Sequence, residues 1–380
     1  MSVSVENRRS RTRSVLAAVL TLLILVPAGI LFARAWDDVS DRKESTRLEQ
    51  KGVEYLTALG PLVSALTEAQ SSALSGVATP PSSLTSAVAG VSAVDQRLGA
   101  ELRTRDRWSG LKQRIDLLPK ATGGPLAVYQ AHVEVADLTL ALYDAVRNNS
   151  ELARDPDNDI SHLQQAVADD LPAAVVQMSR MSDLSQLVAK ADAQQRAQLG
   201  PQFGAAVVEV NTSVNNLTDN LQAAVDDTSS PTLSGNLVSG LDAFRRGVEL
   251  LTRGANPTGA PNASTIATAQ TRLQVSLGNL AGITTREMTR LLDDRLDSLG
   301  YRTLETLAAA IAAVLLALAA IILPLTGRRR GASGPSPSAR APGESTRDMT
   351  VGPGGVELGG QMPAYGDATS TRRERTGALR

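Results

Sequence analysis

The chain has no cysteine and few aromatic residues, which make up only 3% of its 380 residues. The absence of cysteine excludes disulfides, cysteine-ligated zinc and thiol catalysis. The shortage of aromatic side chains, together with abundant alanine, leucine and valine, favours slender helical bundles over sheets or a broad globular core. These absences narrow the fold class to all-α.

The chain also lacks a strongly basic charge and the common catalytic motifs. Its formal net charge is −1, which argues against a nucleic-acid-binding surface, because such a surface needs clustered basic residues. No phosphate-binding loop, glycine-rich strand-to-helix turn or Gly-x-Ser-x-Gly nucleophile motif occurs. We therefore expect a non-enzymatic protein without a cofactor.

Two long apolar runs are present. Residues 15–32 and 306–325 are uncharged and mostly apolar, and each run has the roughly 18 to 20 residues that cross a bilayer core. Arginines precede the first run and follow the second: Arg8, Arg9, Arg11 and Arg13, and Arg328, Arg329 and Arg330. Clustered arginines stay on the cytoplasmic side of a membrane. The pattern predicts a multi-pass plasma-membrane protein with both termini in the cytoplasm.

This topology divides the chain into five segments. We expect a basic cytoplasmic N-terminus at residues 1–14, a first transmembrane helix at 15–35 and a second at 303–326. Residues 36–302 form the extracytoplasmic domain, and residues 327–380 form a cytoplasmic tail. The tail is rich in Gly, Pro, Ser, Thr and Arg and has few large apolar residues, a composition typical of disorder.

The first apolar run has an alternative interpretation. Ala33-Arg34-Ala35 has the small-x-small pattern of a signal-peptidase site, so the run is either an uncleaved anchor or a signal peptide. Its apolar stretch exceeds the roughly 7 to 15 residues usual in signal peptides, which favours the anchor.

The extracytoplasmic segment has helical periodicity. Two apolar stripes each predict a core-facing helix, and they comprise Leu48, Tyr55, Leu59, Leu62, Leu66, Ala69 and Ala73, and Leu273, Leu277, Leu280, Met288, Leu291 and Leu299. Shorter helices are expected near residues 83–118, 126–152, 160–197, 203–227 and 232–253. Gly60-Pro61 should interrupt the first long helix, because proline lacks a backbone donor. We therefore expect an all-α membrane protein, in which two transmembrane helices flank an elongated extracytoplasmic helical bundle.

The candidate ligand site is a group of arginines beside a tryptophan. Arg103, Arg107 and Arg114 are spaced to share one helical face, close to Trp108. Outside the membrane, such a face would bind a carboxylate or another anion through paired hydrogen bonds. Acidic residues nearby offer the alternative of a solvated face of mixed charge.

Metal binding is not expected. His132 and His162 are the only histidines, and neither has a partner at ligand spacing. Asp155, Asp157 and Asp159 alternate as at the start of a calcium loop, but the glycine and the bidentate glutamate of such a loop are missing. We expect these aspartates to cap a helix instead.

The second span and the tail each hold one further candidate. Ala309, Ala313 and Ala317 recur every four residues, which suits close packing against the first span or a second copy; alanine is also frequent enough here for chance recurrence. In the tail, phosphorylation of Thr376, beside Arg375, would change the local charge by about two units and switch a docking site. A passive, solubilising tail is the alternative.

The order of a basic start, a span, a long helical exterior and a second span that ends on arginines resembles bacterial chemoreceptors and sensor kinases. The resemblance covers residues 1–330 and is architectural. It implies dimerisation, binding between helices and signalling by small helix shifts. No kinase or coiled coil follows Arg330, and this layout is similar to that of actinobacterial membrane receptors that link an amino-acid-binding lipoprotein to a soluble Ser/Thr kinase. The preference for arginine over lysine also suits a GC-rich actinobacterial genome.

We therefore expect a non-enzymatic transmembrane sensor or signal transducer. Its outer bundle would bind a small solute or an extracytoplasmic solute-binding protein, and a cytoplasmic partner such as a Ser/Thr kinase would receive the signal. The chain would act as a homodimer in the membrane. The alternative is a cell-envelope scaffold that tethers partners without sensing a ligand.

Reporter fusions test the orientation. A reporter enzyme fused after Ser230 should be active outside the cell and one fused after Gly331 inside it, because the two arginine clusters hold both termini in the cytoplasm. Activity inside at Ser230 would overturn the topology. The mass of the mature chain distinguishes the anchor, which keeps Ala35 joined to Trp36, from a cleaved signal peptide.

Overall fold

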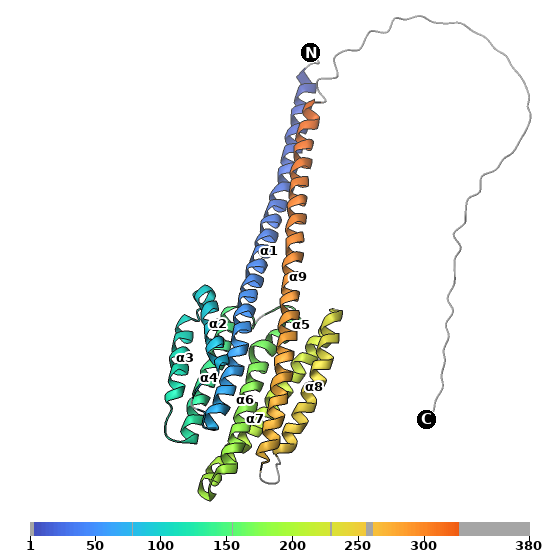
Figure 1. The fold of residues 1–380 in the computed structure, drawn as a ribbon. Coiled ribbons are helices and arrows are strands. Elements are labelled where there is room, and N and C mark those ends of the chain that lie inside the picture. Colours follow the sequence, from blue (N-terminus) through green and yellow to red (C-terminus); the bar gives the residue numbers. More distant parts are fainter. Residues whose placement is uncertain (1–3, 78, 154, 229, 256–260, 327–380) are drawn as a thin grey trace, which may run out of the picture. The chain divides into compact units, whose positions relative to one another are not determined.

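The computed structural model describes residues 4–77, 79–153, 155–228, 230–255 and 261–326. Residues up to Leu325 form one compact unit, and the predicted tail at 327–380 lies outside the described residues. The described part of the chain consists of helices joined by short turns (Figure 1). The expected all-α class is confirmed.

Two helices are much longer than the others. α1 (Ser4–Leu74) has 71 residues and α9 (Ala263–Thr326) has 64, so each is about 100 Å long at about 1.5 Å per residue. Each contains one stretch that is long and apolar enough to cross a membrane, and neither stretch is buried inside the protein. Two candidate membrane helices are therefore present, as the sequence predicted.

α1 and α9 run side by side in opposite directions (Figure 1). Hydrogen bonds join them at intervals along the bundle, among them Lys43 Nζ to Thr303 Oγ1 (2.6 Å), Gln50 Nε2 to Asp293 Oδ1 (2.6 Å) and Gln274 Nε2 to Thr67 Oγ1 (3.2 Å). The shorter helices pack around this pair. They are α2 (Ser82–Leu98), α3 (Arg105–Leu117), α4 (Pro125–Asn149), α5 (Asn158–Gln165), α6 (Leu171–Lys190), α7 (Ala193–Asp227) and α8 (Pro231–Ala255), with a 3₁₀ turn at Leu118–Lys120 and a π-helical turn at Ala166–Asp170.

The predicted apolar stripes form much of the core. On α1, Tyr55, Leu59 and Leu62 are fully buried. On α9, the stripe is buried as predicted at Leu273, Leu277, Leu280, Met288 and Leu299, while Leu291 is half-buried and its neighbour Leu292 is fully buried instead. The helical period of apolar residues therefore identified the faces by which both long helices contact the bundle.

The predicted interruption at Gly60-Pro61 is wrong, because α1 continues through Pro61 without a break. A proline inside a helix costs about 3 kcal/mol. Leu59 and Leu62, on either side of the proline, are both fully buried, and each buried leucine contributes about 2 kcal/mol or more. Packing of the turns on both sides outweighs the local cost.

The helix expected over residues 83–118 is divided in two. α2 ends at Leu98, and α3 begins only at Arg105. The Asp95 carboxylate fixes the intervening turn, because it accepts hydrogen bonds from the Thr104 hydroxyl (2.7 Å) and from the buried Tyr55 hydroxyl on α1 (2.8 Å). A side-chain acceptor thus competes with the continuation of the helix, as short polar residues often do.

α1 contacts the end of α4 so closely that only glycine fits at position 52. A Cβ atom there would lie 2.2 Å from Ser150 Oγ and 2.5 Å from Ser150 Cβ. Gly52→Ala should therefore destabilise the protein by about 1 to 3 kcal/mol, the usual effect of overpacking. Thermal unfolding of the full chain measures this.

The matched control for Gly52→Ala is Gly204→Ala on α7, where a Cβ atom would have nothing within 4 Å. This control should stabilise the helix by roughly 0.5 to 1 kcal/mol. Equal effects of the two substitutions would contradict the close contact at Gly52.

Candidate functional site

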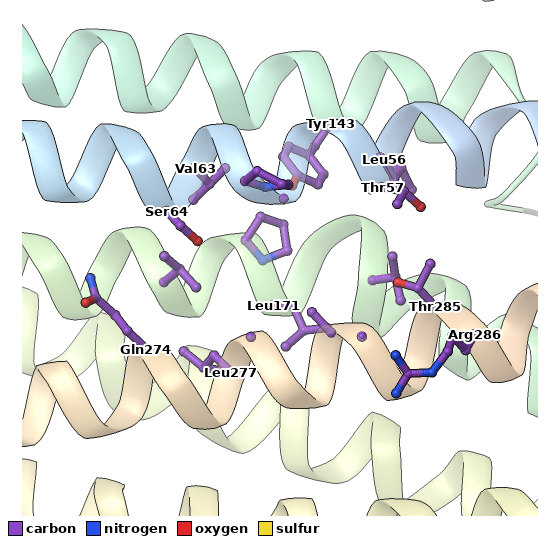
Figure 2. A pocket seen from close by; sticks show the side chains of 18 residues that line it. Leu56, Thr57, Val63, Ser64, Tyr143, Leu171, Gln274, Leu277, Thr285 and Arg286 are labelled. Carbon is purple, nitrogen blue, oxygen red and sulfur yellow. The ribbon is translucent and has the colours of Figure 1, made fainter. Parts of the chain in front are cut away.

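A cavity of about 440 Å³ lies between α1, α6 and α9, and Figure 2 shows its walls. Pockets that bind small molecules typically measure about 300 to 1,000 Å³ and are mostly apolar. The wall residues are largely aliphatic or small: Leu56, Thr57, Gly60, Pro61, Val63, Ser64, Tyr143, Val167, Leu171, Pro172, Val175, Gln274, Leu277, Gly278, Ala281, Gly282, Thr285 and Arg286. The cavity therefore suits a ligand with an apolar body.

Glycines keep this cavity open on both long helices. A Cβ atom built on Gly60 of α1 or on Gly278 of α9 would meet no atom within 4 Å. Neither residue has the positive φ that would require glycine, and each costs its helix about 1 kcal/mol relative to alanine. The absence of a side chain at Gly60 and Gly278 therefore contributes to the open space of the cavity.

The Tyr143 hydroxyl is a polar group of the cavity wall. Tyr143 is only 4% exposed, and its hydroxyl has no hydrogen-bond partner among the described residues. Burial raises the pKa of Tyr143, so the hydroxyl keeps its proton at neutral pH. The hydroxyl is therefore available to donate a hydrogen bond to a group that enters the cavity.

Arg286 is the one charged residue among those that line the cavity. Its side chain is exposed on α9 and has no ion-pair partner within the described part of the chain. In Figure 2, Arg286 and Thr285 lie at the same end of the cavity as Leu56 and Thr57. Two polar side chains of the wall already form hydrogen bonds within the protein. The Gln274 amide donates to the Thr67 hydroxyl (3.2 Å), and the Thr57 hydroxyl donates to the Val53 carbonyl (2.7 Å). Arg286 is thus free to bind an anionic group.

A second cluster, centred on Arg295 of α9, lies nearer the candidate span. Its guanidinium donates two parallel hydrogen bonds to Asp155 (2.6 and 2.9 Å) and one to Asp157 (2.7 Å), both in the turn before α5. It also contacts Glu49 of α1 at 3.3 Å. Paired bonds between arginine and a carboxylate are strong and directional. This charged cluster therefore joins α1, α9 and the α4–α5 turn.

The charged cluster is buried, and it contains more carboxylates than cations. The side chain of Asp155 is fully buried, and those of Glu49 and Arg295 are 3% and 14% exposed. Burial, followed by repulsion from Asp155, raises the pKa of Glu49 to about 8, and Arg295 opposes this rise. Glu49 is therefore mainly protonated in the folded protein at neutral pH.

The predicted arginine face is spread over two elements. Arg103 lies in the turn before α3 with φ +52°, and Arg107 is exposed on α3. Arg114 pairs with Glu134 of α4 (3.3 Å), and Trp108 is buried in the core at 5% exposure. The structure therefore separates these residues by role, and binding of an anion by the exposed arginines stays a prediction.

The predicted alanine seam is partly on the protected side of α9. Ala313 and Ala317 are half-buried where α1 runs beside α9, whereas Ala309 is exposed and Ala310 is half-buried in its place. Packing of this seam against a second copy stays a prediction. Thr376, the predicted phosphorylation site, lies outside the described residues.

The two histidines and the aspartates of the α4–α5 turn contact other protein groups. His132 is buried, and burial lowers its pKa to about 4; His162 lies 3.2 Å from Asn220. No group of three or more metal-ligating side chains occurs among the residues that the structure describes. Asp157 precedes α5 without capping it through its side chain, so the expectation of capping is wrong there, because Arg295 binds this carboxylate.

Sequence reasoning missed both Arg295 and the cavity. The partners of Arg295 lie 140 and 246 residues away along the chain, and no spacing rule connects them. The glycines at 60 and 278 were a usable signal, because an unexplained glycine inside a helical pattern often has a packing or functional reason. No protein-family model, curated protein or solved structure matches this chain.

The protonation of Glu49 gives a testable dependence of stability on pH. A carboxyl whose pKa rises from 4.5 when unfolded to about 8 when folded binds its proton more tightly in the native state. The free energy of unfolding should therefore fall as the pH rises from about 4.5 to 8. Glu49→Gln should flatten this slope and stabilise the protein at pH 8 by about 1 to 3 kcal/mol.

Thermal or denaturant unfolding at pH 5, 6.5 and 8 measures the effect of Glu49→Gln. Glu44→Gln, an exposed carboxylate on the same helix, is the matched control and should leave the slope unchanged. An unchanged slope in Glu49→Gln would show that Glu49 is ionised in the folded protein.

Proposed function

We propose that this protein is a non-enzymatic transmembrane sensor whose outer helical bundle binds a small solute in the α1–α6–α9 cavity. The observation that supports this proposal is the identity of the cavity walls. α1 and α9 each contribute residues to the cavity, and the same two helices contain the candidate membrane spans. A ligand between them contacts both elements that would carry a signal.

The mechanism requires two arrangements of α1 against α9 with different affinities for the ligand, because a ligand shifts an equilibrium only by this difference. Helix translations of about 1 to 2 Å are a common form of such switching. The gaps in the wall at Gly60 and Gly278 leave room for a small displacement without a clash. Binding would thus favour one arrangement of the helix pair.

The charged cluster is well placed to pass on the displacement. Arg295 precedes Thr306, the first residue of the apolar run, by about 16 Å along α9, and Arg286 precedes it by about 30 Å. The cluster thus lies between the cavity and the span. Its buried bidentate pair makes α9 and the α4–α5 turn move together, because separating Arg295 from Asp155 would leave a charge unpaired.

The rest of the proposal concerns orientation and partners. The two arginine clusters favour a plasma-membrane protein with both termini in the cytoplasm and the cavity outside. A homodimer would place four spans together, and a cytoplasmic partner such as a Ser/Thr kinase would bind the tail around Thr376. An extracytoplasmic solute-binding protein could deliver the ligand. The competing proposal is an envelope scaffold, which needs no exchange between helix arrangements.

Spin labels test the proposal, since the cysteine-free chain accepts introduced cysteines at chosen positions. Glu44→Cys on α1 and Ser298→Cys on α9 are exposed positions between the charged cluster and the candidate spans. Full-length protein in lipid nanodiscs would first be screened with solutes for a rise in melting temperature. A stabilising solute should then shift the distance between the labels by about 1 to 2 Å.

Gly278→Leu is the matched control, because it fills the cavity; it should abolish both the stabilisation and the shift. A solute that stabilises the protein through this cavity without changing the distance between the labels would favour the scaffold.

A further inference from the structure

We propose that the cavity takes a small amphipathic organic anion, in which a carboxylate meets Arg286, a second oxygen accepts from the Tyr143 hydroxyl and an apolar chain fills the remaining space. This inference rests on the proposed function, because it names the ligand class of the same cavity. The inference is based on three observations: Arg286 without an ion-pair partner, the Tyr143 hydroxyl without a hydrogen-bond partner among the described residues, and the size of the cavity.

The first step is the charge. Arg286 is the one charged group among those that line the cavity, and it has no ion-pair partner within the described part of the chain. Elsewhere in the bundle, arginines that face a carboxylate do pair with it, for example Arg97 with Glu54 (2.5 Å) and Arg180 with Asp137 (2.5 Å). A planar guanidinium binds carboxylates in bidentate fashion. An anionic end group is therefore favoured at this end of the cavity, and a cationic one is disfavoured.

The second step is the buried hydroxyl. Tyr143 is 96% buried, and its unpaired O–H is a donor at neutral pH. A purely aliphatic ligand would remove water from this group without replacing its hydrogen bond, which lowers affinity. A ligand oxygen along the chain satisfies it. In Figure 2 the tyrosine reaches the cavity beside α1, and Arg286 lies on α9 opposite, so the two polar groups of the ligand are separate.

The third step is the size. About 440 Å³ of space holds about 15 non-hydrogen atoms at about 30 Å³ each, the share of one water molecule in the liquid. Most of the remaining wall is aliphatic and includes Val63, Leu171 and Leu277; in Figure 2, Val63 and Leu277 lie on the side of Tyr143 away from Arg286. Short acyl chains fit both the volume and the lining. N-acyl amino acids and similar acyl-chain acids have the required combination of chain, carbonyl oxygen and carboxylate.

N-hexanoylglycine is the probe for this inference. Its neutral counterpart, N-hexanoylglycine amide, lacks the charge, and nonanoate lacks the acyl oxygen but keeps the chain and the carboxylate. Binding of each compound to full-length protein in nanodiscs would be measured by titration calorimetry, with empty nanodiscs as the control for partition into lipid. The acid should bind about tenfold more tightly than its amide, the effect of one charge-assisted hydrogen bond.

Three variants connect the affinities to the residues. Arg286→Gln should remove the preference for the acid, whereas Arg272→Gln, an exposed arginine of α9 that does not line the cavity, should keep it. Tyr143→Phe should weaken N-hexanoylglycine about tenfold and leave nonanoate unchanged. Gly278→Leu should abolish binding of all three compounds, and Gly204→Leu on α7 should not.

Equal affinity for the acid and the amide would overturn the inference, as would acid binding that survives Gly278→Leu or no binding at all. The proposed function is tested separately by the spin-label distance. If the acid binds with the expected response of the variants and the distance stays constant, the ligand class stands and the sensor fails. If a different class of solute shifts the distance through this cavity, the sensor stands and the ligand class fails.

Discussion

Packing of the shorter helices against the two long helices, α1 and α9, is the interaction on which the rest of this structure depends. Both helices are continuous from the bundle into an apolar stretch that is able to cross a membrane. A continuous helix transmits a displacement along its axis, because its hydrogen bonds keep the rise of each residue constant. The shorter helices bury the apolar faces of α1 and α9. The cavity and the charged cluster both contain residues from these two helices.

The cavity and the charged cluster have opposite effects on the contact between α1 and α9. In the cavity, contact between the two helices is reduced by glycines, so the pair is loosely packed and the position of one helix against the other is weakly fixed. At Arg295 the contact is buried and charged, which makes it costly to break. A loose region next to a firm one allows the helices to tilt or slide as rigid rods about the firm contact. Under the proposed function, such a tilt would carry a small change in the cavity toward the candidate spans.

The sequence predicted the parts of this arrangement that depend on local pattern. Apolar periodicity identified the buried faces at Leu59 and Leu280, and charge next to long apolar runs identified the candidate spans. It failed at Pro61, where tertiary burial outweighs propensity, and between Leu98 and Arg105, where the Asp95 side chain ends a helix. Arg295 with Asp155, and Tyr143 with the glycines of the cavity, are juxtapositions between distant segments. No local rule contains that information.

The π-helical turn at Ala166–Asp170 has a consequence for the wall of the cavity. A π turn holds one residue more than an α turn, so every residue after it is rotated by about 100° around the helix axis relative to an uninterrupted α-helix. Leu171, Pro172 and Val175 follow this turn and line the cavity. Their orientation is therefore a matter of helical phase. A chain with one residue more or fewer within 166–170 would present another face of α6 to the same space, and the shape of the cavity would change even with Leu171, Pro172 and Val175 kept.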